Sequence, residues 1–403
     1  MTAKLTLLLC VGGCLVLGGC LGERDERSRI AGGTLTVYAS LPRHGVSAPA
    51  AAAVAAGERL ALRDAGGRAG GRRIRLVTLD ASTAGERVWQ PDRVSENAER
   101  AADDDTTIAY LGELDYGASA VSVPITNEAG ILQVSPGDGL TSLTRRPPGR
   151  PRAGPERYYP SGERTFLRLV PSDLSQAETL LAQARAAGVT RLAILYDQEI
   201  YGRELAAQIA ARARRDGPDP VASEEYRGAV DEIPDIVRSL AAERPNGVVY
   251  AGVAGPGSGR MLATIDAHLP GAPVYATAGL LARDPRRPVP AAPRGVTAYS
   301  PIRPAATLPA AGRRTLRRLR TTYGPSAARP EALYGYEAMR LVLEAVRRAG
   351  PDREGVVAAA RDLRVRHAAF GAYRVRATGD VEAGGFALYA LRDGRFVFER
   401  MLR

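Results

Sequence analysis

Residues 108–139, IAYLGELDYGASAVSVPITNEAGILQVSPGDG, decide the fold of this chain. They contain two short apolar runs, at 108–111 and 131–134, and the segment between them at 118–128 has helical character. Runs this short and apolar are typical of strands buried on both faces of a parallel sheet. Each run ends in small residues, so we expect two turns side by side at the carboxyl edge of one sheet.

These two turns form the candidate binding site. In open α/β sheets, ligands bind beyond the carboxyl ends of the strands, where backbone N–H groups and helix N-termini collect. The candidate ligand-binding residues of the turns are Asp115, Tyr116, Gly117, Gly137, Asp138 and Gly139. Gly137 and Gly139 are expected to leave N–H groups free for an anionic or carbonyl oxygen, and the helix beginning near Ala118 adds its positive end. The alternative for Asp138 is a turn residue without ligand contact.

Residues 1–19 have the pattern of an export signal. Lys4 precedes an apolar segment at 5–17, and the sequence LGGC follows at 17–20. A basic start, a short apolar run and small residues before a cleavage point are typical of signal peptides, and the segment is too short for a stable transmembrane span. The ending resembles the lipobox of bacterial lipoproteins, which implies that Cys20 is acylated and anchors the chain to the membrane. An ordinary secretory signal is the alternative.

The rest of the chain must be stabilised by core burial. Residues 20–33 are polar and charged, which predicts a flexible tether. The chain has three cysteines, at 10, 14 and 20, so cleavage before Cys20 leaves one and no disulfide framework can form. A chain of 403 residues is long enough for two domains.

The positive charge does not indicate nucleic-acid binding. The formal net charge is +11, and removing residues 1–19, with Lys4 and no acid, leaves 11 − 1 = +10. The remaining basic residues are arginines scattered among acids, and only 5% of residues are aromatic, which leaves few side chains for stacking on bases. We therefore expect no nucleic-acid partner.

Strand-like and helical segments alternate along the chain. Expected strands lie at 34–39, 73–79, 108–111, 131–134, 165–170, 191–196, 247–250, 274–276, 373–376, 386–391 and 396–399. Expected helices lie at 47–65, with Ser47 as a cap, and at 91–103, 118–128, 173–187, 204–215, 233–242, 255–268, 308–323, 330–349 and 353–363. This alternation favours parallel sheets with right-handed crossovers, closed by a hairpin turn at Asp393 and Gly394.

Two stretches interrupt the alternation. Residues 144–164 are rich in arginine and proline, which predicts a long surface loop, either disordered or binding a partner. A second proline-rich connection is expected at 284–294.

Four segments resemble a known family. They are ERLALRDAGGRAGGRRIRLVTLD at 58–80, PITNEAGILQVSP at 124–136, LAILYDQEIYGRELA at 192–206 and ALYGYEAMRLVLEAVRRAG at 332–350. Their order and spacing resemble the type I periplasmic substrate-binding proteins, in particular the leucine/isoleucine/valine-binding branch of ABC uptake systems. The resemblance implies two Rossmann-like α/β lobes with parallel-sheet cores joined by three crossover segments. It also implies that a ligand is trapped in the cleft between them when they close about a hinge.

The resemblance also divides the chain and assigns first-lobe contacts. It implies a first lobe at 34–167 with 301–385, and a second lobe at 168–300 with 386–403. The family's serine after the third strand falls near Asp115 or Tyr116. Its contacts after the Ser-Pro turn fall on Gly137 and Gly139, where the usual threonine hydroxyl is missing.

The second-lobe contacts are kept only in part. One family tyrosine is retained as Tyr201, either stacked on ligand or packed between the lobes. Another is replaced near Val253, and the acid that pairs with the ligand ammonium falls near Ala278. An ammonium is then poorly held unless Asp115, Asp138 or another acid substitutes. We therefore expect leucine, isoleucine and valine to bind more weakly than an uncharged or N-substituted acid or amide.

Binding rather than catalysis is expected. The three histidines, at 44, 268 and 367, lack metal-ligand spacing, and no nucleophile elbow, P-loop or CxxC motif is present after residue 20. We expect no metal, no cofactor and no enzymatic activity. The resemblance implies a lipid-anchored, monomeric extracytoplasmic protein that binds a small molecule and delivers it to an ABC permease with its ATPase. A sensory or interaction module of the same fold is the alternative.

Overall fold

The fold is described from a computed structural model. It describes residues 28–86, 88–255, 257–282, 295–361, 363–382 and 384–402. The predicted signal peptide, Cys20, most of the tether and the proline-rich connection at 284–294 lie outside these residues. None of the helices within the described ranges combines the length and apolar character of a membrane span.

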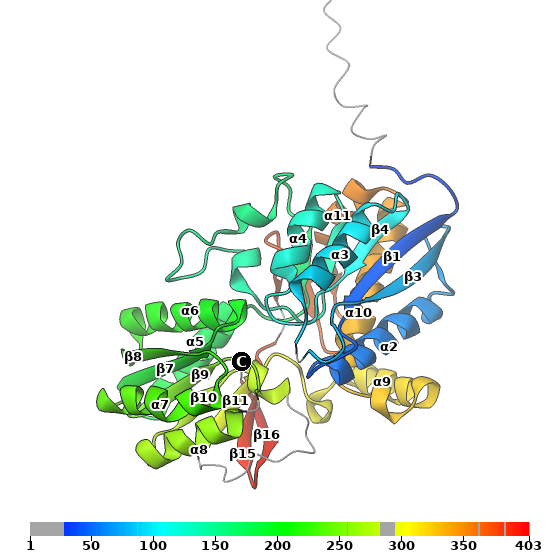
Figure 1. Cartoon of the computed structure of the whole chain (residues 1–403). Helices are drawn as coiled ribbons and strands as arrows, with labels where there is room; N and C mark the ends of the chain where they lie inside the picture. The colour runs from blue at the N-terminus through cyan, green and yellow to red at the C-terminus, as the bar shows by residue number, and fades with distance from the viewer. Residues whose placement is uncertain are drawn as a thin grey trace, which may run out of the picture.

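The first lobe is built on a six-stranded sheet in the order β2-β3-β1-β4-β5-β6 (Figure 1). Its strands are β1 (Thr34–Leu41), β2 (Arg68–Ala69), β3 (Arg72–Asp80), β4 (Thr107–Leu111), β5 (Leu132–Ser135) and β6 (Phe166–Arg168). All pairs are parallel except β2 with β3. The strands β4 and β5 are buried along their whole length, as expected for apolar runs covered on both faces.

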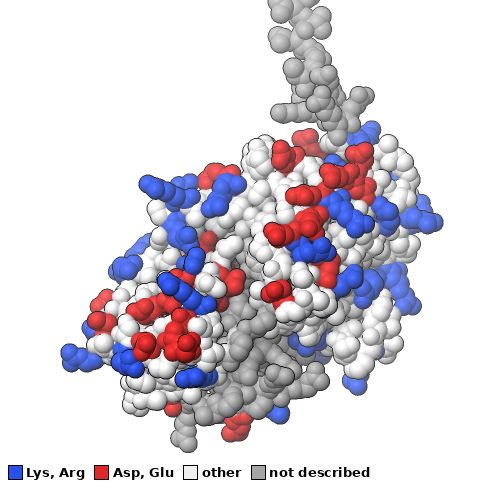
Figure 2. Space-filling view, viewed as in Figure 1, with Lys and Arg blue, Asp and Glu red and all other residues white. Residues whose placement is uncertain are grey.

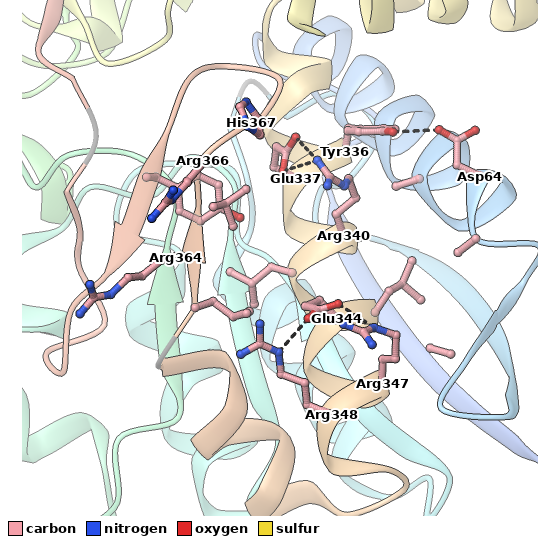
Figure 3. A pocket seen from close by; sticks show the side chains of 18 of the residues that line it. Asp64, Tyr336, Glu337, Arg340, Glu344, Arg347, Arg348, Arg364, Arg366 and His367 are labelled. Atoms are coloured by element: carbon pink, nitrogen blue, oxygen red, sulfur yellow. Dashed lines mark hydrogen bonds and ion pairs between the residues drawn. The ribbon is translucent and has the colours of Figure 1, made fainter.

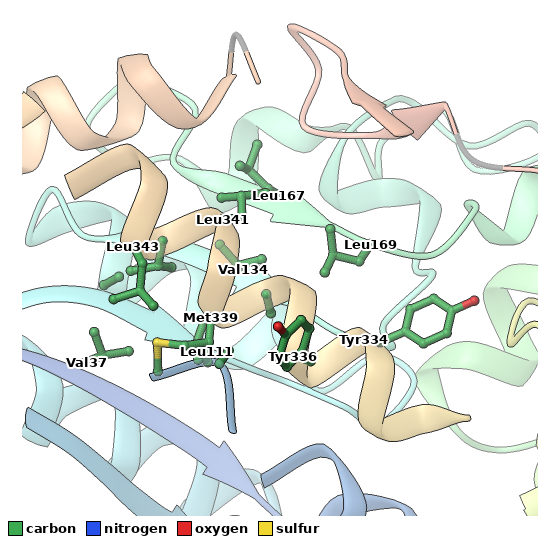
Figure 4. Packing of buried hydrophobic residues seen from close by; sticks show 14 of the residues in the cluster. Val37, Leu111, Val134, Leu167, Leu169, Tyr334, Tyr336, Met339, Leu341 and Leu343 are labelled. Carbon is green, nitrogen blue, oxygen red and sulfur yellow. The ribbon is translucent and has the colours of Figure 1, made fainter. Parts of the chain in front are cut away.

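Six helices cover this sheet. They are α2 (Ala48–Asp64), α3 (Pro91–Ala102), α4 (Ser119–Glu128), α9 (Ala310–Tyr323), α10 (Glu331–Ala349) and α11 (Arg353–Arg361). The helix α10 packs Met339, Leu341 and Leu343 onto strand residues such as Leu111 and Val134 (Figure 4). Glycines let α2 and α10 approach closely, because a Cβ on Gly57 or Gly335 would collide with the backbone of the other helix. The C-terminal third of the chain therefore completes the first core.

The second lobe has a seven-stranded sheet in the order β16-β15-β11-β10-β9-β7-β8. Its strands are β7 (Arg191–Asp197), β8 (Asp219–Tyr226), β9 (Gly247–Ala251), β10 (Val274–Ala276), β11 (Val296–Ser300), β15 (Phe386–Arg392) and β16 (Arg395–Leu402). Its helices are α5 (Asp173–Ala186), α6 (Ile200–Asp216), α7 (Ile233–Ala242) and α8 (Ser258–His268). Only β15 and β16 run antiparallel to their neighbours. Two mostly parallel α/β sheets confirm the predicted fold class.

The chain passes between the two sheets three times, from β6 to α5, from β11 to α9, and from β14 to β15. The strand β14 (Val381–Glu382) belongs to a small third sheet with β12 (Arg364–Val365) and β13 (Tyr373–Val375). A buried ion pair joins the end of β6 to this small sheet, because Arg168 lies 3.1 Å from Asp380, the residue before β14. The backbone N–H of Arg168 also donates to the carbonyl of Gly379 at 3.0 Å.

The expected strands miss β8 and β11, as well as the two-residue strands β2, β12 and β14. The strand β8 has the sequence DPVASEEY and lies at the edge of the second sheet, where most of its residues keep partial solvent contact. An edge strand needs no continuous apolar run, so its sequence lacks the signal of a buried strand. The predicted hairpin is confirmed, since Asp393 and Gly394 have φ of 48° and 73° between β15 and β16.

The expected disorder of residues 144–164 is wrong. Tyr158 and Tyr159 are buried in a small apolar cluster, and the Tyr159 hydroxyl donates to the carbonyl of Leu143 at 2.6 Å. Arg145 forms an ion pair with Asp380 at 2.5 Å. Two tyrosines and an arginine therefore fasten the segment to the first lobe, although its composition resembles that of a disordered chain.

Candidate ligand site between the lobes

The two predicted turns lie side by side. The turn after β4 contains residues 115–117, the turn after β5 contains residues 137–139, and a Cβ on Gly137 would collide with the carbonyl of Leu114. Both turns also touch the second lobe. A Cβ on Gly117 would lie 3.3 Å from Ile200, and one on Gly139 would collide with Asp173. Glycine is therefore needed where the lobes meet.

Asp138 is a structural residue of this region. Its side chain is fully buried, and Oδ1 accepts the N–H groups of Gly117 and Leu140, both at 3.0 Å. Its Oδ2 accepts the N–H of Ser119 at 2.9 Å. The carboxylate therefore joins the two turns and neutralises the positive end of α4. The turn-residue alternative describes Asp138 correctly.

The expectation of a free N–H group for a ligand oxygen is wrong at Gly137. Asp138 takes the N–H of Gly117, and the hydroxyl of Ser135 takes the N–H of Gly137 at 3.2 Å. The carbonyl of Gly139 accepts the N–H of Asp173 at 2.8 Å. Backbone N–H groups do lie at the ends of these strands, but the carboxylate of Asp138 and the hydroxyl of Ser135 accept their hydrogen bonds.

Asp115 has a carboxylate that is only partly hydrogen-bonded. Its Oδ1 accepts the hydroxyl of Ser47, while its buried Oδ2 has no hydrogen-bond partner among the described residues. Burial and, less strongly, the charge of Asp138 raise the pKa of Asp115 to about 6, although the bond from Ser47 opposes this. Ser47 was predicted to cap α2, but its hydroxyl makes no capping bond and serves Asp115 instead.

Asp173, which sequence reasoning missed, faces the same region from the second lobe. It begins α5, is 5% exposed, and its Oδ2 has no partner within the described ranges. Burial raises the pKa of Asp173 well above its usual range, Asp138 and Glu204 raise it further, and only Arg168 opposes them. In the sequence, Asp173 indicates only the start of a helix, because Asp is common in a first helical turn.

Tyr116 lies among these carboxylates. Burial raises the pKa of its hydroxyl, and the charges of Asp173, Asp115, Asp138 and Glu331 raise it further. Glu331 begins α10, and its buried Oε2 has no partner in the part of the chain that the structure describes. The charges of four acids from both lobes therefore act on the pKa of one phenol.

Tyr201 is a packed aromatic between the lobes. It is fully buried, its ring stacks on Tyr116 at 4.6 Å between centroids, and its hydroxyl donates to Gln176 at 2.9 Å. Val253 contributes its backbone N–H, which donates to Asp197 at 2.6 Å. Ala278 is buried at the start of a short 3₁₀ helix and carries no charge.

Cations are scarce at this site. Arg168 is fully buried and paired with Asp380, and Arg329 donates to Glu331 Oε1 at 3.1 Å. On the face shown in Figure 2, arginines and acids are interspersed over both lobes. No group of three or more metal-binding side chains occurs in the described ranges. The site can therefore stabilise a positive charge supplied from outside the protein.

Two α/β lobes joined by three passages, with acids and aromatic rings where they meet, define a two-lobed binding protein. A family model described as periplasmic binding protein matches residues 34–395. The chain belongs to this family, which confirms the resemblance inferred from the four sequence segments.

Solved structures with the same fold include three from different bacteria. An ABC transporter solute-binding protein of R. palustris in complex with benzoate has 19% identity and a TM-score of 0.70, over 92% of this chain and 96% of that one. A substrate-binding protein of Desulfitobacterium hafniense in complex with Leu has 21% identity and a TM-score of 0.70, over 91% and 100%. A leucine-binding protein of Thermotoga maritima has 19% identity and a TM-score of 0.71, over 91% and 98%. No curated protein matched the sequence.

Proposed function

We propose that this chain is the extracytoplasmic solute-binding subunit of an ABC uptake system, anchored through acylated Cys20, and that it binds a small organic cation between its lobes. The family and the names of the similar solved proteins support the transport role. One observation carries the ligand class: Asp115 of the first lobe and Asp173 of the second each have a buried carboxylate oxygen without a hydrogen-bond partner among the described residues.

The argument for a cation is electrostatic. An ionised carboxylate that loses water without gaining a partner costs several kcal/mol, so a buried acid either binds a proton or pairs with a positive group. Asp115 and Asp173 lie on opposite lobes and have no arginine of their own within ion-pair distance in the described structure. A primary amine or guanidinium between them supplies the missing charge and up to several N–H donors.

Aromatic rings add to this preference. The stacked rings of Tyr116 and Tyr201 lie beside the acids, and an aromatic face attracts a cation by about 0.5–2 kcal/mol. Asp138 already accepts the hydrogen bonds of the N–H groups of Gly117 and Ser119. A ligand carboxylate therefore has fewer backbone donors at the first-lobe turns than the sequence suggested. We therefore propose an amine as the ligand, in place of the acid or amide that the sequence led us to expect.

Calorimetry of the full chain in detergent tests the ligand class. Agmatine and putrescine are the cationic probes, and L-leucine and benzoate are the comparison ligands. At pH 8 an amine should bind more tightly than both comparison ligands, and its affinity should fall below pH 6 as Asp115 gains a proton. Tighter binding of leucine or benzoate than of either amine would exclude the cationic site.

Two variants locate the site. Asp115→Asn and Asp173→Asn should each weaken amine binding at least tenfold, because each removes one carboxylate charge at contact distance. Asp231→Asn is the control, since Asp231 is exposed on the second lobe and should leave affinity unchanged. Equal affinity in all three variants would place the ligand elsewhere.

A further inference from the structure

A cavity of about 520 Å³ lies on the first lobe. Its walls come from α2, β2, α10, β13 and the segment at 363–367, and it shares no lining residue with the site between the lobes (Figure 3). This volume is within the range of small-molecule sites. Because every wall belongs to the first lobe, the cavity exists independently of how the lobes close.

The cavity has more positive than negative charge available. Its three acids are already bound: Asp64 by Arg318 and by the hydroxyl of Tyr336, Glu337 by Arg340, and Glu344 by Arg347 and Arg348. Three further arginines of the lining have no ion-pair partner within the described structure, namely Arg68, Arg364 and Arg366. Figure 3 shows Arg366 across the cavity from Arg340 of α10.

A buried hydroxyl without a partner lines the inner wall. Tyr373 is 4% exposed, and its Oη has no hydrogen-bond partner in the part of the chain that the structure describes. A buried hydroxyl left unpaired costs about 1–3 kcal/mol, so such a group commonly meets a water or ligand acceptor. The remaining wall is largely apolar, with Ala61, Ala65, Leu341 and Val365.

We propose that this cavity binds an amphipathic anion, in which an apolar body lies on the alanine and leucine wall and a phosphate or carboxylate group pairs with Arg364 and Arg366. Guanidinium groups bind such oxyanions through paired N–H donors, and Tyr373 supplies a further donor from the inner wall. The anionic head on an apolar body is common to phospholipids and to soluble aromatic phosphates. The site is distinct from the proposed amine site, whose charge preference is opposite.

Phenyl phosphate is the probe for the full chain, with calorimetry and thermal unfolding as readouts. It should bind and raise the melting temperature, and inorganic phosphate should bind at least tenfold more weakly because it lacks the apolar body. The double variant Arg364→Gln/Arg366→Gln should lose at least tenfold in affinity, and Tyr373→Phe about threefold or more. Arg374→Gln is the matched control, because Arg374 is exposed on β13 outside the cavity and should have no effect.

The outcomes separate the two anion sources. The first test uses the Cys20→Ser chain with lipid vesicles. If phosphatidylglycerol vesicles capture this chain, phosphatidylcholine vesicles do not, and phenyl phosphate competes with the capture, the anion in this cavity is a lipid headgroup. Binding of phenyl phosphate that depends on Arg364 and Arg366, without vesicle capture, identifies a soluble anion. Absence of phenyl phosphate binding, or equal binding by the folded double variant, would overturn the proposal.

Discussion

Replacing Asp138 tests whether this residue contacts ligand or stabilises the two turns, the two roles that the sequence allows for it. The carboxylate is fully buried and accepts three backbone N–H groups at 2.9–3.0 Å. In Asp138→Ala, three buried donors lose their partner at about 1–3 kcal/mol each. With partial replacement by entering water, we expect the free energy of unfolding to fall by about 3–6 kcal/mol, a large share of the 5–15 kcal/mol typical of a domain.

Asp138→Asn should give an intermediate loss. The amide keeps one oxygen for Gly117 and Leu140 but directs an N–H group at the N–H of Ser119, so we expect a loss of about 1–3 kcal/mol. The single tryptophan, Trp89, packs against Ala118 beside the same turn, so its fluorescence in urea reports unfolding of this region.

The control is Asp105→Ala, an exposed first-lobe acid, which should change stability by less than about 0.5 kcal/mol. A stable Asp138→Asn protein that has lost ligand would assign Asp138 to the ligand instead. An Asp138→Ala protein with an unchanged urea midpoint would refute the structural role.

Three further predictions concern the rest of the molecule. Burial raises the pKa of Glu58 and of Glu113 to about 8, so the folded protein keeps protons that the unfolded chain releases near pH 4.5. The free energy of unfolding should therefore fall as the pH rises from about 5 to 8. Glu58→Gln removes one of these acids and should flatten a plot of melting temperature against pH. Arg168→Met should lower the free energy of unfolding by about 3–5 kcal/mol in urea, because Asp380 loses its most buried partner, and Asp380→Asn in the same chain should recover part of the loss. Cys20→Ser should move the protein from the membrane to the soluble fraction of fractionated cells, and membrane retention would contradict the lipid anchor.

The fold was predictable because burial shapes the sequence of parallel strands directly. The strands β4 and β9 are apolar runs without polar alternation, and β5 is buried along its whole length although it contains Gln133 and Ser135; glycine or proline follows each of the three closely in the chain. The failures occur where burial is incomplete or where composition suggests disorder. The edge strand β8 carries acids, and the segment at 144–164 has prolines and arginines around two buried tyrosines.

The adjacency of the two turns was predictable, but the hydrogen bonds of their side chains were not. The turns at 115–117 and 137–139 follow two neighbouring parallel strands, so their adjacency can be predicted from the sheet topology alone. The partners of Asp138 depend on the direction of one side chain within a turn. The approach of Asp173 to Gly139 depends on how the lobes meet, and no local periodicity encodes that contact.

If the ligand is the proposed amine, the acids between the lobes would couple its binding to closure. With the lobes apart, water can solvate Asp115 and Asp173, and their charges need no protein partner. With the lobes together, both oxygens are buried, so closure without a cation requires the acids to take up protons. A bound amine removes that requirement and therefore favours the closed arrangement by the difference between its affinities for the two states. On this proposal, the same unpaired carboxylates would give both the selectivity toward positive charge and the dependence of closure on ligand.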